Sequence, residues 1–198
     1  MIDLPGVPLK ELGDAQKAQL ATIGAAFAAL LSVFNIAGRI SWASLSDYIG
    51  RKRTYAIFFA LGTALYAAAP FAGRIGSVAL FVAIFCVILT MYGGGFATIP
   101  AYLADIFGTQ FVGAIHGRLL TAWSAAGILG PVLVNYIREY QIGRGVPAAQ
   151  AYNVTMYVLA GLLVAGLLCN LAVRPVNERY YMSDEELARE RGLLTARA

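Results

Sequence analysis

Charged residues are scarce in this sequence, and their scarcity excludes an ordinary soluble domain. Asp, Glu, Lys and Arg make up 13% of the 198 residues, whereas hydrophobic residues make up 59%. Soluble domains carry about 25% charged residues, because the surface of a protein folded in water needs many polar side chains. This chain has too little polar sequence to make such a surface and is therefore predicted to be a membrane protein.

Cysteine and histidine are also too few to build a metal site or a disulfide framework. Cys86 and Cys169 lie in apolar segments without C-x-x-C spacing, and His116 is the single histidine. We interpret the cysteines as packed thiols and His116 as a solvated loop residue, and we expect no metal and no cofactor. The apolar segments lack paired carboxylates or a Ser/His/Asp set, so we expect no enzyme.

The net charge of +4 does not indicate a nucleic-acid partner. The aromatic residues lie inside apolar runs and not on a basic face, as nucleic-acid binding would require. We interpret the basic residues as loop residues that orient the chain in the lipid bilayer. A signal peptide is also missing, since residues 1–19 contain acids and prolines where an apolar core would be needed.

Long apolar runs are what the sequence has in quantity. A transmembrane helix needs about 20 mostly apolar residues, and Gly, Pro or charged residues separate the candidate segments. The predicted spans cover residues 18–45, 54–72, 78–103, 119–137 and 152–173, and the predicted loops include 73–76, 105–117 and 138–147. The expected fold class is all-α, a polytopic membrane helix bundle with about five transmembrane helices.

The distribution of Lys and Arg predicts the orientation of the chain. If loop 47–53 faces the cytoplasm, the inner set is Arg39, Arg51, Lys52, Arg53, Arg118, Arg174, Arg179, Arg189, Arg191 and Arg197, and the outer set is Lys10, Lys17, Arg74, Arg138 and Arg144. The inner excess predicts a multi-pass plasma-membrane protein with its N-terminus outside and its C-terminus in the cytoplasm. In the tail, SDEELARERGLL predicts a short solvated helix with Ser183 as N-cap.

The basic loop ASLSDYIGRKR joins the first two spans. A carboxylate at Asp47 is favoured near a helix N-terminus, Gly50 permits a tight turn, and Arg51 and Lys52 are expected at the anionic membrane surface. These four residues resemble the loop signature G-x-x-x-D-x-x-G-R-[KR] of the major facilitator superfamily, with Ala43 in place of the first Gly. The resemblance implies a gating motif that latches one state of an alternating-access cycle; a plain basic anchoring loop is the alternative.

Further stretches resemble the second half of the oxalate/formate antiporter family, relatives of the monocarboxylate transporters. They are FNIAGRISWASLSDYIGRK, IPAYLADIFG, GRLLTAWSAAGILGP and the tail VRPVNERYYMSDEELARERGLL. That family has twelve helices in two halves, with the substrate between them near the bilayer midplane. The resemblance implies that residues 1–17 are an outer loop, 18–175 a C-terminal half-bundle lacking its first helix, and 176–198 a cytoplasmic tail. The missing N-terminal half is then an expected partner.

Arg39 is the sharpest candidate for a substrate contact. It precedes Asp47 by eight residues, about 12 Å along a helix, so it lies inside the bilayer, where a guanidinium usually faces a cavity. Its planar fork fits a carboxylate, and Asn35 lies on the same helical face. The resemblance implies an Arg here in carboxylate transporters, although monocarboxylate relatives place Asp at the position of Asn35. The alternative is that Arg39 snorkels to the headgroups.

Tyr92, Thr121 and Trp123 are further candidates for lining a substrate site, with simple packing as the alternative for Tyr92 and Trp123. The resemblance implies that oxalate exchange uses a second cation, a Lys, on the helix that corresponds to 119–137. This chain has none there. A single cation favours a monoanion such as formate, pyruvate or lactate over oxalate.

Glycine and proline mark two candidate hinges, YGGGF and GILGP, which contain Gly94, Gly127, Gly130 and Pro131. Small residues let helices approach each other, and Pro131 frees a backbone carbonyl and can bend its helix. Hinge motion during rocking and close packing are both open interpretations, and they do not exclude each other.

Two hypotheses of function follow. The first is a C-terminal fragment of a secondary active transporter for small carboxylates, either a monocarboxylate carrier or an oxalate/formate exchanger. It predicts a cavity that faces the absent half and is lined by Asn35 and Arg39. The second is a non-transport membrane scaffold or partner subunit, which predicts that Arg39 is neutralised within the chain or across a dimer.

Overall fold

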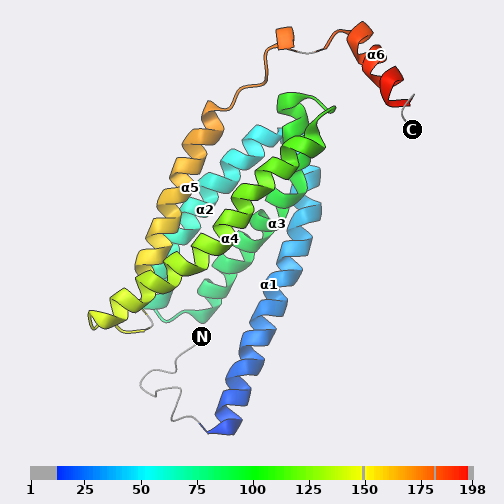
Figure 1. The fold of residues 1–198 in the computed structure, drawn as a ribbon. Helices are drawn as coiled ribbons and strands as arrows, with labels where there is room; N and C mark the ends of the chain where they lie inside the picture. The colour runs from blue at the N-terminus through cyan, green and yellow to red at the C-terminus, as the bar shows by residue number, and fades with distance from the viewer. Residues whose placement is uncertain (1–12, 149, 181, 196–198) are drawn as a thin grey trace.

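The computed structural model describes residues 13–148, 150–180 and 182–195, and five long helices make up most of them (Figure 1). The elements are α1 (Asp14–Ile49), α2 (Arg51–Arg74), α3 (Val78–Phe107), α4 (Val112–Gly143), α5 (Asn153–Ala172), the 3-10 turn η2 (Glu178–Tyr180) and α6 (Asp184–Thr195). Each of the five long helices is long and apolar enough to cross a membrane. The predicted all-α bundle with five spans is confirmed.

The helices extend beyond the apolar runs that predicted them. The loop expected at 105–117 shrinks to 108–111, and most of the loop expected at 138–147 belongs to α4. Backbone hydrogen bonding continues along a helix after its apolar run ends, because polar side chains are at no disadvantage outside the hydrocarbon region. Hydropathy therefore predicted the existence of each helix but not where it ends.

Three helix pairs form the packed part of the bundle. α1 packs most extensively against α3, and α2 packs against α5 and α3. A core forms where α2 and α3 meet, and its buried members are Phe58, Ala69, Ala72, Ile84, Ile88 and Met91. By contrast, α4 crosses in front of the others in Figure 1 and contains no buried residue among those described.

Glycines allow α1 and α3 to touch backbone to backbone. A Cβ atom built on Gly38 of α1 would lie 2.1 Å from the carbonyl oxygen of Thr90 on α3. A Cβ built on Gly93 of α3 would lie 2.1 Å from the carbonyl oxygen of Asn35 on α1. No side chain larger than hydrogen fits at either position, so the small residues set the distance between the two helices.

Trp42 fixes the rotation of α1 on α3. Its indole Nε1 donates a hydrogen bond to Oγ1 of Thr90, at 3.2 Å. Its ring packs edge-on against Phe58 of the core, with centroids 5.0 Å apart. Gly94 makes room for it, since a Cβ there would lie 2.5 Å from the Cβ of Trp42. The predicted hinge residue Gly94 is thus closely packed in this conformation.

The tail helix α6 begins with the predicted cap. The amide of Glu186 donates to Oγ of Ser183 at 3.3 Å, and the amide of Ser183 donates to Oε2 of Glu186 at 3.0 Å. This reciprocal pair is a capping box. The backbone and hydroxyl donors of Ser183 stabilise the carboxylate, so they lower the pKa of Glu186.

Replacing Gly38 by Ala is expected to separate α1 from α3, because the new methyl group meets the rigid backbone of Thr90. We expect a loss of about 1–3 kcal/mol in the free energy of unfolding, measured by denaturant titration in detergent. Gly24→Ala on the same helix is the matched control, since nothing lies within 4 Å of its Cβ position. Equal stability of the two variants would contradict close contact at Gly38.

Because the pKa of Glu186 is lowered in the folded chain, its cap stabilises α6 fully above the ordinary Glu pKa. That stabilisation is lost as the pH falls through the lowered value. Carbon-detected NMR titration of the intact chain measures this pKa directly. Ser183→Ala is expected to move the pKa of Glu186 back toward its ordinary value, whereas Ser41→Ala on α1 leaves it where it is. If the pKa of Glu186 is the same in Ser183→Ala as in the unmodified chain, the capping box does not form.

Candidate functional site

Arg39 lies on an exposed part of α1, toward the end of the helix that meets α2. Its Nε donates to Oδ1 of Asn35, one turn earlier, at 3.3 Å. Asn35 is half-buried, so it anchors the mobile guanidinium to the helix surface. No carboxylate among the described residues forms an ion pair with Arg39. The arrangement presents a cation whose terminal N–H groups have no anionic partner in that part of the chain.

The glycine contact places the stem of Arg39 directly on α3. A Cβ built on Gly93 would lie 3.3 Å from Cγ of Arg39. The packing of α1 on α3 therefore brings Arg39 to Gly93. Tyr92 precedes Gly93 in the sequence, but successive residues of a helix point in different directions, so this contact does not place the two side chains together.

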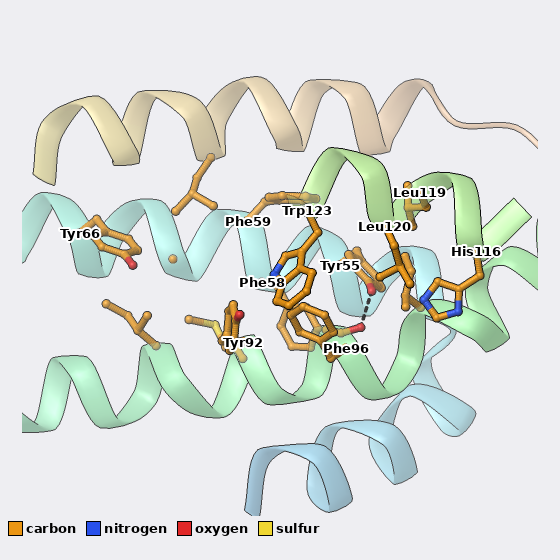
Figure 2. A pocket seen from close by; sticks show the side chains of 16 residues that line it. Tyr55, Phe58, Phe59, Tyr66, Tyr92, Phe96, His116, Leu119, Leu120 and Trp123 are labelled. Carbon is orange, nitrogen blue, oxygen red and sulfur yellow. Dashed lines mark hydrogen bonds between the residues drawn. The ribbon is translucent and has the colours of Figure 1, made fainter. Parts of the chain in front are cut away.

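A row of three aromatic rings connects α3 to α4 (Figure 2). The rings of Tyr92 and Phe96 have centroids 5.1 Å apart, and those of Phe96 and Trp123 are 5.7 Å apart, both edge to face. This is the favoured geometry for aromatic pairs. Tyr92 is 49% exposed and Trp123 56% exposed. Both predicted residues therefore offer ring surface to a ligand, and Phe96, which sequence reasoning missed, joins them.

The aromatic row forms one wall of an apolar cavity of about 370 Å³ between α2, α3 and α4 (Figure 2). Tyr92, Phe96 and Trp123 line it, whereas Asn35 and Arg39 do not. His116 lines the cavity as well and is half-buried. Its interpretation as a solvated loop residue is wrong, because α4 begins at Val112 and already includes it.

Of the remaining candidates on α4, Thr121, Gly127 and Pro131 are exposed and Gly130 is half-buried. The hydroxyl of Thr121 donates to the carbonyl of Arg118 in its own helix, at 2.7 Å. A Cβ built on Gly127 or Gly130 would meet nothing within 4 Å, and α4 continues as a helix through Pro131. The role of Thr121 as a substrate contact stays a prediction. The roles of Gly127, Gly130 and Pro131 as hinges also stay predictions.

An ionic network occupies the turn between α1 and α2. Gly50 has φ of +88°, a conformation that favours glycine, which confirms the tight turn. Across it, Asp47 in the last turn of α1 pairs with Arg51 in the first turn of α2. The Nε of Arg51 also lies 3.8 Å from a carboxylate oxygen of Asp105, near the end of α3. The motif thus joins the ends of three helices.

A second polar network ties α2 to α5. Lys52 donates to the carbonyl oxygens of Leu171 and Val173, at 2.9 and 2.7 Å, where α5 ends and its carbonyls lack intrahelical partners. Asn170 donates to the carbonyl of Lys52 at 3.1 Å and accepts from the hydroxyl of Tyr102 at 2.9 Å. The expectation that Lys52 lies at the membrane surface stays a prediction, and the structure adds that Lys52, although exposed, binds the neighbouring helix. An Asn in an otherwise apolar span was the signal that could have revealed this.

The described residues contain no group of three or more His, Cys, Asp or Glu side chains that could hold a metal ion. Five helices that are each long and apolar enough to cross a membrane define a polytopic helical membrane protein. The sequence profile of the Major Facilitator Superfamily matches residues 4–196. The chain therefore belongs to this superfamily of transporters.

Two curated proteins show which members it is similar to. It is 28% identical over 162 residues to the oxalate:formate antiporter of Oxalobacter formigenes, a match that covers 79% of this chain and 36% of the antiporter. It is 30% identical over 114 residues to apicoplast pyruvate carrier 1 of Toxoplasma gondii, covering 56% of this chain and 19% of the carrier. The chain thus spans well under half the length of either relative. No solved structure matches it significantly.

Replacing Tyr102 by Phe removes the hydroxyl that binds Asn170 and leaves a buried acceptor without its donor. We expect the free energy of unfolding to fall by about 1–3 kcal/mol. Tyr92→Phe is the matched control on the same helix, since no described residue accepts a hydrogen bond from its hydroxyl. Thermal unfolding in detergent measures both. If the two variants unfold alike, the Tyr102–Asn170 bond does not stabilise the bundle.

Proposed function

We propose that this chain forms one wall of a secondary carrier for small carboxylates, which works by alternating access. In this proposal Arg39 and Asn35 on α1 contact the substrate, and Tyr92 and Trp123 contribute the apolar cavity that they line. The opposite wall comes from an N-terminal half of the same fold. In this proposal the chain lies in the plasma membrane with its N-terminus outside and its C-terminus in the cytoplasm.

One observation carries the proposal: Arg39 is hydrogen-bonded to Asn35 but has no anionic partner among the described residues. A guanidinium within an apolar helix is costly, and such residues pair or mark a substrate pathway. The planar fork of arginine binds a carboxylate through two parallel hydrogen bonds. The bond from Arg39 to Asn35 uses the inner Nε and leaves the terminal groups for the substrate.

The substrate class is supported by the relatives and by the charge of α4. An antiporter of oxalate and formate and a carrier of pyruvate, as their names state, both handle small carboxylates. Between Arg118 and Arg138, α4 carries no Lys or Arg, so Arg39 is the one cation proposed for the substrate. We propose a monocarboxylate, such as formate, pyruvate or lactate, ahead of oxalate.

The scaffold hypothesis predicts an internal or intersubunit partner for Arg39. Within the described part of the chain no carboxylate pairs with it, so no observation favours a scaffold. The ionic network of Asp47, Arg51 and Asp105 supports the gating assignment instead, because its ion pairs join the ends of three helices at one place, as a latch requires.

Uptake of labelled pyruvate, lactate, formate and oxalate tests the proposal, in cells that express the chain together with any coding sequence that precedes Met1. Arg39→Ala and Arg39→Lys are expected to lower monocarboxylate uptake by about 10- to 100-fold, the loss of a charged hydrogen-bond pair. Lys keeps the charge but cannot form the bidentate contact.

Arg74→Ala is the matched control, because this exposed arginine ends α2 far from Arg39. Its uptake is expected to equal that of the unmodified protein at equal membrane abundance. Full uptake in both Arg39 variants would place the carboxylate elsewhere and leave Arg39 as a membrane anchor. Absence of any uptake by the unmodified protein, with the protein present in the membrane, would favour the scaffold.

A further inference from the structure

A separate cavity of about 550 Å³ lies at the end of the bundle where α1 meets α2 and where α5 ends. In Figure 1 this is the upper end, from which the tail leaves toward α6. Three consecutive cations at the start of α2, residues 51–53, line it together with one carboxylate, that of Asp105. Apolar side chains of α3 and α5, including Ile106 and Leu171, form the remaining wall. The cavity thus combines a basic rim with an apolar interior.

The three cations differ in what they already bind. Arg51 is paired with Asp47 and lies near Asp105, and Lys52 is held by the carbonyls at the end of α5. Arg53 is exposed, and no described residue provides it with an acid or an acceptor. The buried Nε of Arg51 also has no hydrogen-bond partner among the described residues. The rim therefore keeps both unneutralised positive charge and unused donors.

The helix itself adds to this potential. Amides of residues 51–53 open α2, and the first amides of a helix have no intrahelical acceptor. The partial positive charge of the helix N-terminus points to the same end. An anion at this rim would meet side-chain and backbone donors together, independently of the Arg39 site.

We propose that this cavity binds an anionic phospholipid, with its phosphate on Arg53 and the start of α2 and one acyl chain along the apolar wall. Basic pockets between transmembrane helices are suited to lipid headgroups. The apolar wall favours a lipid over free phosphate, which would use the rim alone. The excess of positive charge favours an anionic headgroup over a zwitterionic one. Bound there, the lipid would contact α2, α3 and α5 at once.

Native mass spectrometry of the purified full chain, titrated with phosphatidylglycerol or phosphatidylcholine, tests the proposal. We expect phosphatidylglycerol to remain bound and phosphatidylcholine to dissociate. A large molar excess of inorganic phosphate is expected to leave the bound lipid in place. Equal retention of the two lipids would overturn the proposal, because the headgroup would not be recognised. Displacement by phosphate would also overturn it and assign the site to a free anion.

Arg53→Gln and Arg74→Gln form a matched pair, since both arginines are exposed on α2 but only Arg53 lines the cavity. We expect Arg53→Gln to weaken phosphatidylglycerol binding about fivefold, the contribution of one basic residue near a membrane surface. Arg74→Gln is expected to bind it unchanged. Equal weakening in both variants would indicate attraction to net charge alone, and unchanged binding in Arg53→Gln would exclude the assigned phosphate position.

Discussion

The backbone contact between α1 and α3 is the constraint on which the rest of the site depends. Because Gly38 and Gly93 carry no side chain, the two helices approach until each glycine faces a carbonyl of the other helix. In a bilayer, where burial of apolar surface gives little drive for helix association, such close packing is a main source of attraction. The same contact holds Asn35 against α3 and lays the stem of Arg39 against Gly93. Fold and candidate site therefore share one cause.

Arg51 and Lys52 have partners at the turn between α1 and α2, whereas Arg39 on α1 has no anionic partner among the described residues. At the turn between α1 and α2, Arg51 and Lys52 are each matched, by carboxylates or by the free carbonyls that end α5. Along α1, Arg39 has an amide neighbour and no described carboxylate. Matched charges hold helices together, whereas an oriented but unmatched charge is available to a mobile anion. This contrast is the physical basis for assigning a structural role to the first group and a ligand to the second.

Hydropathy predicted the five spans, because crossing a bilayer requires a minimum length of apolar helix. The loop signature predicted the turn between α1 and α2, because the φ of +88° at Gly50 favours glycine. The partners of Lys52 were missed because they lie at the end of α5, more than a hundred residues away in the sequence, and only Asn170 in that apolar span hinted at a polar contact. His116 was predicted to lie in a loop because α4 begins at Val112, before the apolar run that predicted the helix. Phe96 was missed because a single aromatic in an apolar span looks like packing until its neighbours are known.

The exposure of α4 and of Arg39 is relevant to the proposed substrate path. No described residue of α4 is buried, yet Trp123 reaches Phe96 of α3 and closes the aromatic row. Arg39 lies on α1, and a cation costs about 3 kcal/mol at the centre of a helix in a bilayer, so the part of α1 that bears it is unsuited to lipid. In the proposed carrier, a water-filled cavity between two walls removes that cost, and an arriving carboxylate offsets the charge. The exposure of Arg39 is therefore better explained by an aqueous substrate path than by contact with lipid.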